Sequence, residues 1–229
     1  MLYHIYSRAP IREFLGLTEV PPGRHKFQRA AMANRLPLVV VGVDLAGSPH
    51  RPTGVCILRG LTVQTHVART DEEILRLIDD AKPVLVPMDA PLSLPASRTT
   101  ISDRSGGHFR ECDLELQRRG IRFFPITLGP MRMLTQRGLA LKAKIEKMGY
   151  RVVECYPGGA QDVWGLPRQH RDRQGLRRGL ETMGVRGLTE AMTGDELDAV
   201  TAALVGRWFL LGKGEMLGGE AGIMMPASS

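Results

Sequence analysis

Leu38-Val39-Val40-Val41-Gly42-Val43-Asp44 is the stretch of the chain that decides its fold. A continuous β-branched run of this kind is typical of a strand that is buried on both faces. The segments 53–58 and 61–68 follow it, joined by a tight turn at Arg59-Gly60, and predict an antiparallel hairpin. The sequence therefore predicts a sheet built around the strand that ends on Asp44.

Helices and further strands alternate along the rest of the chain. Short apolar strands are predicted at 84–88 and 151–153, and a further short strand at 222–225. The predicted helices cover residues 71–81, 109–119, 130–148, 168–183 and 195–211. Strands that alternate with helices are typical of α/β proteins, in which helical crossovers join parallel strands. The pattern therefore predicts an α/β fold.

Acidic residues stand where three of the predicted strands end, at Asp44, Asp89 and Glu154. The functional crevice of an open α/β sheet lies beyond the carboxyl ends of its parallel strands. Asp195 and Asp198 lie three residues apart at the start of the last predicted helix, and this spacing places both on one helix face. We therefore expect these acids to form one candidate catalytic site.

Clustered carboxylates favour a particular kind of ligand. Without cations they repel one another and raise one another's pKa values. Hard divalent ions remove that cost, and ligands that are all oxygen suit Mg²⁺ or Mn²⁺ better than zinc. Two such ions can activate water and stabilise the leaving oxygen in phosphodiester cleavage. An acid after a strand is also commonly a turn or cap residue, however, and Asp195 could serve only as a helix N-cap.

Four segments of the chain resemble a known family. They are Val-Gly-Val-Asp-Leu-Ala-Gly (41–47), Met-Asp-Ala-Pro-Leu-Ser-Leu-Pro (88–95), Glu-Cys-Tyr-Pro (154–157) and Asp-Glu-Leu-Asp-Ala-Val-Thr-Ala-Ala-Leu (195–204). Together they resemble the domain-of-unknown-function family 429, whose members are described as predicted nucleases of ribonuclease H-like fold. The last segment also resembles the closing helix of RuvC-type Holliday-junction resolvases, in which Asp-x-x-Asp-Ala supplies metal ligands.

The resemblance covers about residues 38–226 and implies both a fold and a site. The implied fold is a ribonuclease H-like mixed five-stranded sheet flanked by helices. The implied metal ligands are Asp44, Asp89 and Asp195 or Asp198, with Mg²⁺ or Mn²⁺ as the cofactor. Glu154 matches a Glu-x-x-Pro segment of the family, and we expect it to act as a ligand or as a base that orients water.

Basic residues gather in two places that could contact phosphates. The first is the stretch that contains Arg168, Arg171, Arg173 and Arg177, for which a solvated helix face is the equal alternative. The second contains Arg104 and Arg110. Arg110 could line the crevice, or it could pair with Asp113 on the same helix face, and we favour the pairing.

The chain carries a formal net charge of +7, which permits an anionic partner without establishing one. Residues 1–36 hold six Lys and Arg against two Asp and Glu, together with several prolines and no sustained periodicity. We interpret residues 1–36 as a flexible extension and residues 37–229 as a single domain. No apolar run is long enough to span a membrane. Three widely spaced cysteines suggest neither a disulfide framework nor a metal site, which favours a cytoplasmic location.

The function that these features favour is metal-dependent hydrolysis of nucleic acid, with DNA or RNA undecided. Two alternatives stay open. The first is a protein of the same fold that binds metal or nucleic acid without useful turnover. The second is a nucleotide-binding, phosphotransferase-like protein, for which Asp44-Leu45-Ala46-Gly47 is a thin candidate phosphate loop. Aromatic residues make up only 5% of the chain, which gives little support for stacking on single strands.

Overall fold

A computed structural model describes residues 38–103 and 105–227 of the protein. The predicted extension at 1–36 and the candidate phosphate ligand Arg104 lie outside these described residues. Within them, no helix is long and apolar enough to cross a membrane.

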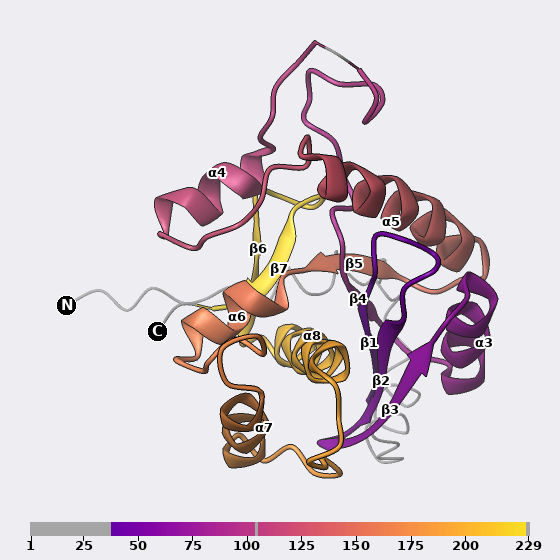
Figure 1. Ribbon diagram of the computed structural model, residues 1–229, viewed down its shortest axis with the longest axis vertical. Coiled ribbons are helices and arrows are strands. Elements are labelled where there is room, and N and C mark those ends of the chain that lie inside the picture. Colours follow the sequence, from indigo (N-terminus) through magenta and orange to yellow (C-terminus); the bar gives the residue numbers. More distant parts are fainter. Residues whose placement is uncertain (1–37, 104, 228–229) are drawn as a thin grey trace, which may run out of the picture. The chain divides into compact units, whose positions relative to one another are not determined.

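A seven-stranded mixed sheet forms the centre of the described part (Figure 1), with the strand order β3-β2-β1-β4-β5-β7-β6. The strands are β1 (Val39–Asp44), β2 (Thr53–Arg59), β3 (Thr62–Ala68), β4 (Val86–Asp89), β5 (Val152–Cys155), β6 (Gly214–Leu217) and β7 (Ile223–Pro226). β1, β2 and β3 pair antiparallel, whereas β4, β5 and β7 continue from β1 in parallel. The predicted α/β class and the hairpin next to β1 are therefore confirmed.

The expected five strands are too few. β7 was expected as a short strand, but β6 was not, and the two form an antiparallel hairpin that extends the sheet beyond β5. β6 has only four residues, begins with Gly214 and includes the charged Glu215. A strand this short gives too few alternating positions to be recognised from periodicity. Its extended conformation is stabilised instead by its pairing with β7.

Helices cover both faces of the sheet (Figure 1). α3 (Asp71–Ala81) and α5 (Gly129–Lys147) pack on one face, where Val41, Val43 and Met88 contribute to their shared core. α7 (Arg173–Thr182) and α8 (Gly194–Leu210) pack on the other face, over Val40, Cys56 and Leu58. α6 (Pro157–Val163) lies against α8, and α4 (Glu111–Arg118) packs beside β6 and β7. The alternation of side chains along each strand thus assigns every strand residue to one of two helical layers.

Glycines let α8 lie unusually close to β1 and β2. A Cβ atom at Gly42 would stand 2.1 Å from the backbone oxygen of Ala199, and one at Gly54 would stand 2.1 Å from the backbone oxygen of Asp195. No side chain fits into such a gap, since real Cβ contacts are far longer. Glycine at these two positions therefore lets the first turns of α8 rest directly on the sheet.

Candidate functional site

Asp44 and Asp89 stand side by side at the carboxyl ends of β1 and β4. The two strands are parallel, and the residues are direct register partners. Val41, Val43 and Met88 contribute to the core under α3 and α5, so the alternating residues Asp44 and Asp89 face the α8 side of the sheet. The pairing brings together two of the acids that the sequence singled out.

The first turn of α8 brings two more acids to the same place. Gly54 is the register partner of Asp44, and the backbone of Asp195 lies directly over Gly54. Thr193, not Asp195, is the N-cap of α8. The Thr193 side chain accepts a hydrogen bond from Glu196 N, and the Glu196 carboxylate accepts one from Thr193 N. The N-cap role considered for Asp195 is thus filled by another residue.

The pKa shifts reflect this convergence. Burial raises the pKa of Asp44 well above its ordinary value, and the charges of Asp89, Asp198 and Asp195 raise it further. Burial and the charge of Asp198 likewise raise the pKa of Asp89. The pKa of Asp198 rises to about 6, chiefly through burial, although a hydrogen bond from Gln161 opposes the rise. Acids from β1, β4 and α8 therefore act on one another as a single electrostatic cluster.

The carboxyls of this cluster differ in their hydrogen-bond partners. Asp198 Oδ1 accepts a hydrogen bond of 2.6 Å from Gln161 Nε2 on α6. No donor among residues 38–103 and 105–227 reaches the carboxyls of Asp44, Asp89 or Asp195. Carboxylates that are partly withdrawn from water are normally hydrogen-bonded or paired with a cation. Three of the four acids in this aspartate cluster (Asp44, Asp89, Asp195 and Asp198) thus have unused ligand capacity.

A hard divalent cation fits the chemistry of the aspartate cluster. Its donors are all carboxylate oxygens, the ligand type that Mg²⁺ and Mn²⁺ prefer. In the described part of the chain, no group of three or more His, Cys, Asp or Glu already has the arrangement of a metal site.

Glu154 forms its hydrogen bonds away from the aspartate cluster, although its charge contributes to the raised pKa of Asp89. It is the register partner of Met88, so its side chain belongs to the α5 side of the sheet. Arg110 Nη1 and Nη2 donate to its two carboxylate oxygens at 2.6 and 2.9 Å, and Leu92 N donates at 2.7 Å. The carboxylate of Glu154 is therefore fully engaged by the protein itself.

Arg110 and Asp113 complete this buried group. Arg110 Nε and Nη2 donate to the carboxylate of Asp113 at 3.0 and 2.8 Å, so one guanidinium bridges two acids. The side chains of Arg110, Asp113 and Glu154 are only 6, 2 and 5% exposed. A guanidinium so enclosed is not open to a phosphate in this structure, and the expected pairing of Arg110 with Asp113 is what is observed. Through Leu92, the group also fixes the segment that follows Asp89.

The remaining candidate arginines differ in whether their side chains bind other described residues. Arg168 is held by Asp162 and by the Tyr156 hydroxyl, and its charge lowers the pKa values of Asp89 and Asp198. Arg177 donates to Glu181 at 2.5 Å and to Gln174 at 2.8 Å. Arg171 and Arg173 are exposed, and neither has an ion pair with another described residue.

Gln161 and Tyr156 are site residues that the sequence analysis did not single out. Gln161 binds both Asp198 and Thr201, and its own amide oxygen is buried without a partner among the described residues. The Tyr156 hydroxyl connects Arg168 to the backbone oxygen of Arg122. Neither residue carries a charge. Tyr156 lies within the segment 154–157, whereas Gln161 lies outside the four family-like segments, and the packing of α6 against α8 places it at the site.

The topology and the site together define the class of the protein. The sheet order β3-β2-β1-β4-β5-β7-β6, with acids at the ends of β1 and β4 and on the helix α8, makes it an α/β protein with a mixed sheet. Residues 42–222 match the family described as protein of unknown function (DUF429). The chain belongs to that family, as its four segments indicated.

Two solved structures resemble the chain over most of its length. RuvC from Thermus thermophilus has 13% sequence identity and a TM-score of 0.43, and the match covers 76% of this chain and 97% of RuvC. The yeast mitochondrial Holliday junction resolvase Ydc2 has 15% identity and a TM-score of 0.36, with 84% and 88% of the two chains covered. No curated protein matches the chain.

The aspartate cluster predicts a specific dependence of stability on pH. In the folded protein the pKa of Asp198 is about 6, above the ordinary 3.8, so its protonated form favours folding. This contribution is present below 3.8 and is lost as the pH rises through about 6, and the raised pKa values of Asp44 and Asp89 act in the same direction. Without metal, we expect the aspartate cluster to lower the free energy of unfolding as the pH increases, by up to about 3 kcal/mol from Asp198.

Denaturation of the wild type and of Asp198→Asn at several pH values, in the presence of a chelator, measures this effect. The variant lacks the titrating carboxyl, so its stability should change less between about pH 4 and about pH 8. Parallel curves for the two proteins would show that Asp198 does not titrate as the site requires.

Proposed function

We propose that this protein is a nuclease that hydrolyses phosphodiester bonds with Mg²⁺ or Mn²⁺ held by Asp44, Asp89, Asp195 and Asp198. The observation that supports this proposal is the convergence of four aspartates from β1, β4 and α8, three of them without a hydrogen-bond donor among the described residues. When bound, divalent metal would supply an activated water and stabilise the leaving oxygen of the phosphodiester.

The protein's own residues have distinct parts in this proposal. Asp44 and Asp89 hold the sheet side of the cation site, and Asp195 and Asp198 hold the helix side. Gln161 fixes the orientation of the Asp198 carboxyl through its hydrogen bond. Glu154 and Arg110 anchor the backbone at Leu92, which sets the position of the segment after Asp89. Arg168 offsets part of the negative charge of the cluster.

We assign Arg171 and Arg173, which are exposed and form no ion pair with another described residue, to the phosphates of the substrate. Replacing both with alanine should weaken nucleic-acid binding and reduce the log–log salt slope by up to about 0.9 for each duplex phosphate that the two arginines neutralise. Arg177→Ala should have less effect, because Arg177 already pairs with Glu181.

Titration of a labelled duplex at several salt concentrations gives both quantities. Arg76→Ala serves as the control, since Arg76 lies on α3 and pairs with Asp80. If affinity and salt slope stay unchanged after both arginines are removed, this stretch is only a solvated surface.

Incubation of the purified protein with single-stranded, duplex, hybrid and branched nucleic acids tests the activity directly. We expect cleavage of at least one substrate with Mg²⁺ or Mn²⁺ and none with chelator. Metal and nucleic-acid binding without any cleavage would support the silent binding protein instead. Binding of ATP without binding of nucleic acid would support the phosphotransferase-like alternative.

A further inference from the structure

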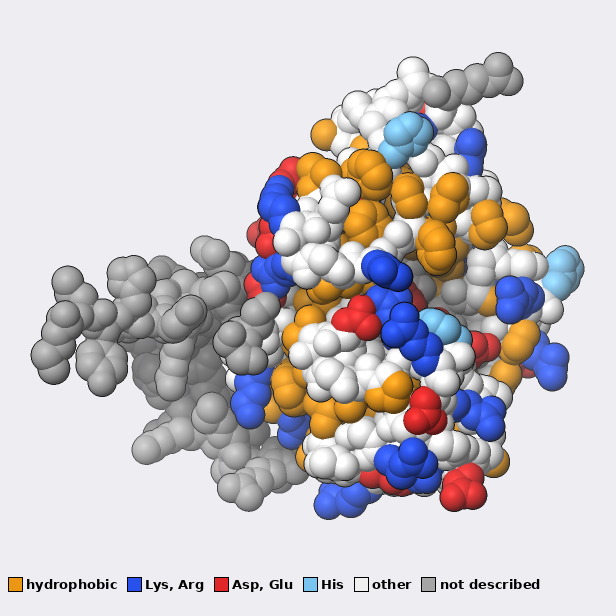
Figure 2. All heavy atoms as spheres, turned by 60° about the vertical axis from the view of Figure 1, so that its left-hand side comes forward, with side chains coloured by type: hydrophobic (Ala, Val, Ile, Leu, Met, Phe, Trp, Pro, Cys, Tyr) orange, Lys and Arg blue, Asp and Glu red, His pale blue; other side chains and the backbone are white. Residues whose placement is uncertain are grey.

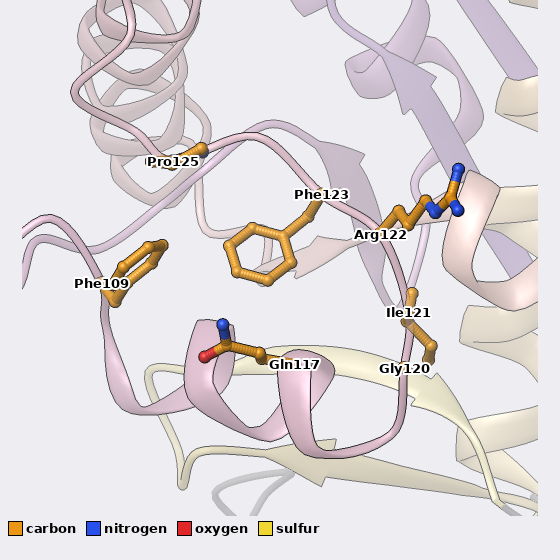
Figure 3. Close-up of a pocket in the computed structure, with 7 residues that line it drawn as sticks. All are labelled: Phe109, Gln117, Gly120, Ile121, Arg122, Phe123 and Pro125. Atoms are coloured by element: carbon orange, nitrogen blue, oxygen red, sulfur yellow. The ribbon is translucent and has the colours of Figure 1, made fainter.

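Several of the few aromatic residues of the protein line two cavities, one of which includes Asp89 in its lining. The chain has six Phe and four Tyr, and four of these ten line two adjoining cavities. One cavity, of about 330 Å³, has Phe109, Gln117 and Phe123 in its lining (Figure 3). The other, of about 170 Å³, includes Phe123, Phe124, Tyr156 and Asp89 in its lining. Phe123 belongs to both, so the aromatic surface runs from the first cavity to an acid of the site.

The larger cavity combines flat apolar walls with one polar group. The Phe109 and Phe123 rings meet edge to face, with centroids 6.0 Å apart and planes at 81°. The side-chain amide of Gln117 extends from α4 toward the space beside these rings (Figure 3). Gln117 is exposed, and no hydrogen bond joins its side chain to another described residue. The cavity therefore offers two rings and an unused donor and acceptor.

The surface around this cavity is apolar to an extent that requires an explanation. Phe124 is 69% exposed and Phe109 is 40% exposed. Hydrophobic side chains gather on the face seen in Figure 2, next to groups of Lys, Arg, Asp and Glu. Contiguous apolar surface of this kind commonly marks a binding site.

Cationic groups connect the cavity to the aspartate cluster. Arg122 lines the cavity, and its backbone oxygen accepts a hydrogen bond of 2.6 Å from the Tyr156 hydroxyl. That hydroxyl accepts one of 2.9 Å from Arg168, the arginine that acts on Asp89 and Asp198. A chain-like ligand with an aromatic ring in the cavity and its backbone extending toward Asp89 would therefore lie close to the positive charges of Arg122 and Arg168.

We propose that the cavity lined by Phe109 and Phe123 binds an unpaired nucleobase of a nucleic-acid strand whose backbone runs toward Asp89. Unstacked bases are bound in proteins by aromatic side chains that stack on them and by amides that hydrogen-bond their edges. Gln117 would contact the edge of the base, and Arg122 would lie near its phosphate. A base inside a duplex is already stacked and paired, and it could enter the cavity only after leaving the helix.

Size and charge favour a base over other occupants. At about 330 Å³, the cavity lies at the lower end of the range of small-molecule pockets, roughly 300–1,000 Å³, so it suits one ring system and not a large ligand. Arg122 in its lining and Arg168, which donates to the backbone oxygen of Arg122 at 3.3 Å, favour an anionic chain such as nucleic acid. The base site deepens the proposed function, because the bound strand would lead to the same aspartates.

Binding measured without metal tests the base site separately from catalysis. In a chelating buffer, fluorescence anisotropy gives the affinity for a labelled single-stranded oligonucleotide, for the matched duplex and for a single strand with abasic positions. We expect the intact single strand to bind best. Phe109→Ala should weaken its binding about tenfold, as the removal of one base–aromatic stack would. Gln117→Ala should weaken it less, and Leu128→Ala, an exposed apolar control outside both cavities, should not.

Three results would overturn the base site. They are equal binding of the intact and the abasic strand, tighter binding of the duplex, and Phe109→Ala behaving like Leu128→Ala although both proteins melt as the wild type does. Failure of the nuclease proposal would look different, because a wild type that binds single strands through Phe109 but cleaves nothing keeps the base site and loses the activity.

Discussion

Replacing Asp89 with asparagine should lower metal-dependent cleavage of nucleic acid by at least about a hundredfold, because divalent metal contributes several kcal/mol of charge stabilisation to phosphodiester hydrolysis. Asparagine keeps the size of the side chain but removes the charge that attracts a cation. Asp44→Asn should have an effect of the same order, since the two residues are register partners on one face of the sheet. Both variants should fold, because removing a charge relieves the repulsion that raises the pKa values of the cluster.

Initial cleavage rates in Mg²⁺ and in Mn²⁺ measure this effect. Asp80→Asn is the matched control, because Asp80 lies on the surface of α3 and pairs only with Arg76 among the described residues. A rate within a few-fold of wild type in both Asp44→Asn and Asp89→Asn would mean that any cleavage occurs elsewhere in the protein.

Removing the Arg110 guanidinium should destabilise the fold by about 3–5 kcal/mol, the usual cost of breaking a buried ion pair from one side. Arg110→Met retains much of the apolar volume but leaves Asp113 and Glu154 buried without their shared cation. The pKa of Glu154 should then rise further, because burial already raises it and the Arg110 charge opposes that rise. A second change, Glu154→Gln, should restore part of the missing stability.

Urea denaturation gives the free energies of unfolding for this comparison. Arg76→Met, which breaks an exposed ion pair on α3, should cost no more than about 1 kcal/mol. If Arg110→Met is as mild as Arg76→Met, then the Arg110–Asp113–Glu154 group does not hold the segment after Asp89 in the way that we describe.

The sequence predicted those parts of the fold that depend on local pattern. The β-branched run at 39–43, the hairpin after it and the helix at 71–81 all follow from periodicity and from capping residues such as Thr70. The end of each parallel strand is also a local feature, and for this reason the approach of Asp44 to Asp89 could be expected before their register was known.

Other features depend on which face of the sheet each residue occupies. Glu154 ends a strand as Asp44 and Asp89 do, but its register with Met88 turns it to the α5 side, where Arg110 binds it. The contact of Gln161 with Asp198 depends on how α6 packs on α8, and the pairing of β6 depends on β7. Local periodicity predicts neither the Gln161–Asp198 contact nor the pairing of β6 with β7. The low aromatic content also gave no hint that Phe123 and Phe124 line a cavity together with Asp89.

Thermal unfolding with increasing Mn²⁺ tests the central claim, that the aspartate cluster is a divalent-cation site, most directly. A ligand that binds only the native state raises its stability by mass action, by about 2.7 kcal/mol at a hundredfold excess over Kd. We predict that Mn²⁺ raises the melting temperature of the wild type and of Asp80→Asn, but not that of Asp44→Asn or Asp89→Asn. An equal rise in all four proteins, or no rise in the wild type, would contradict the account.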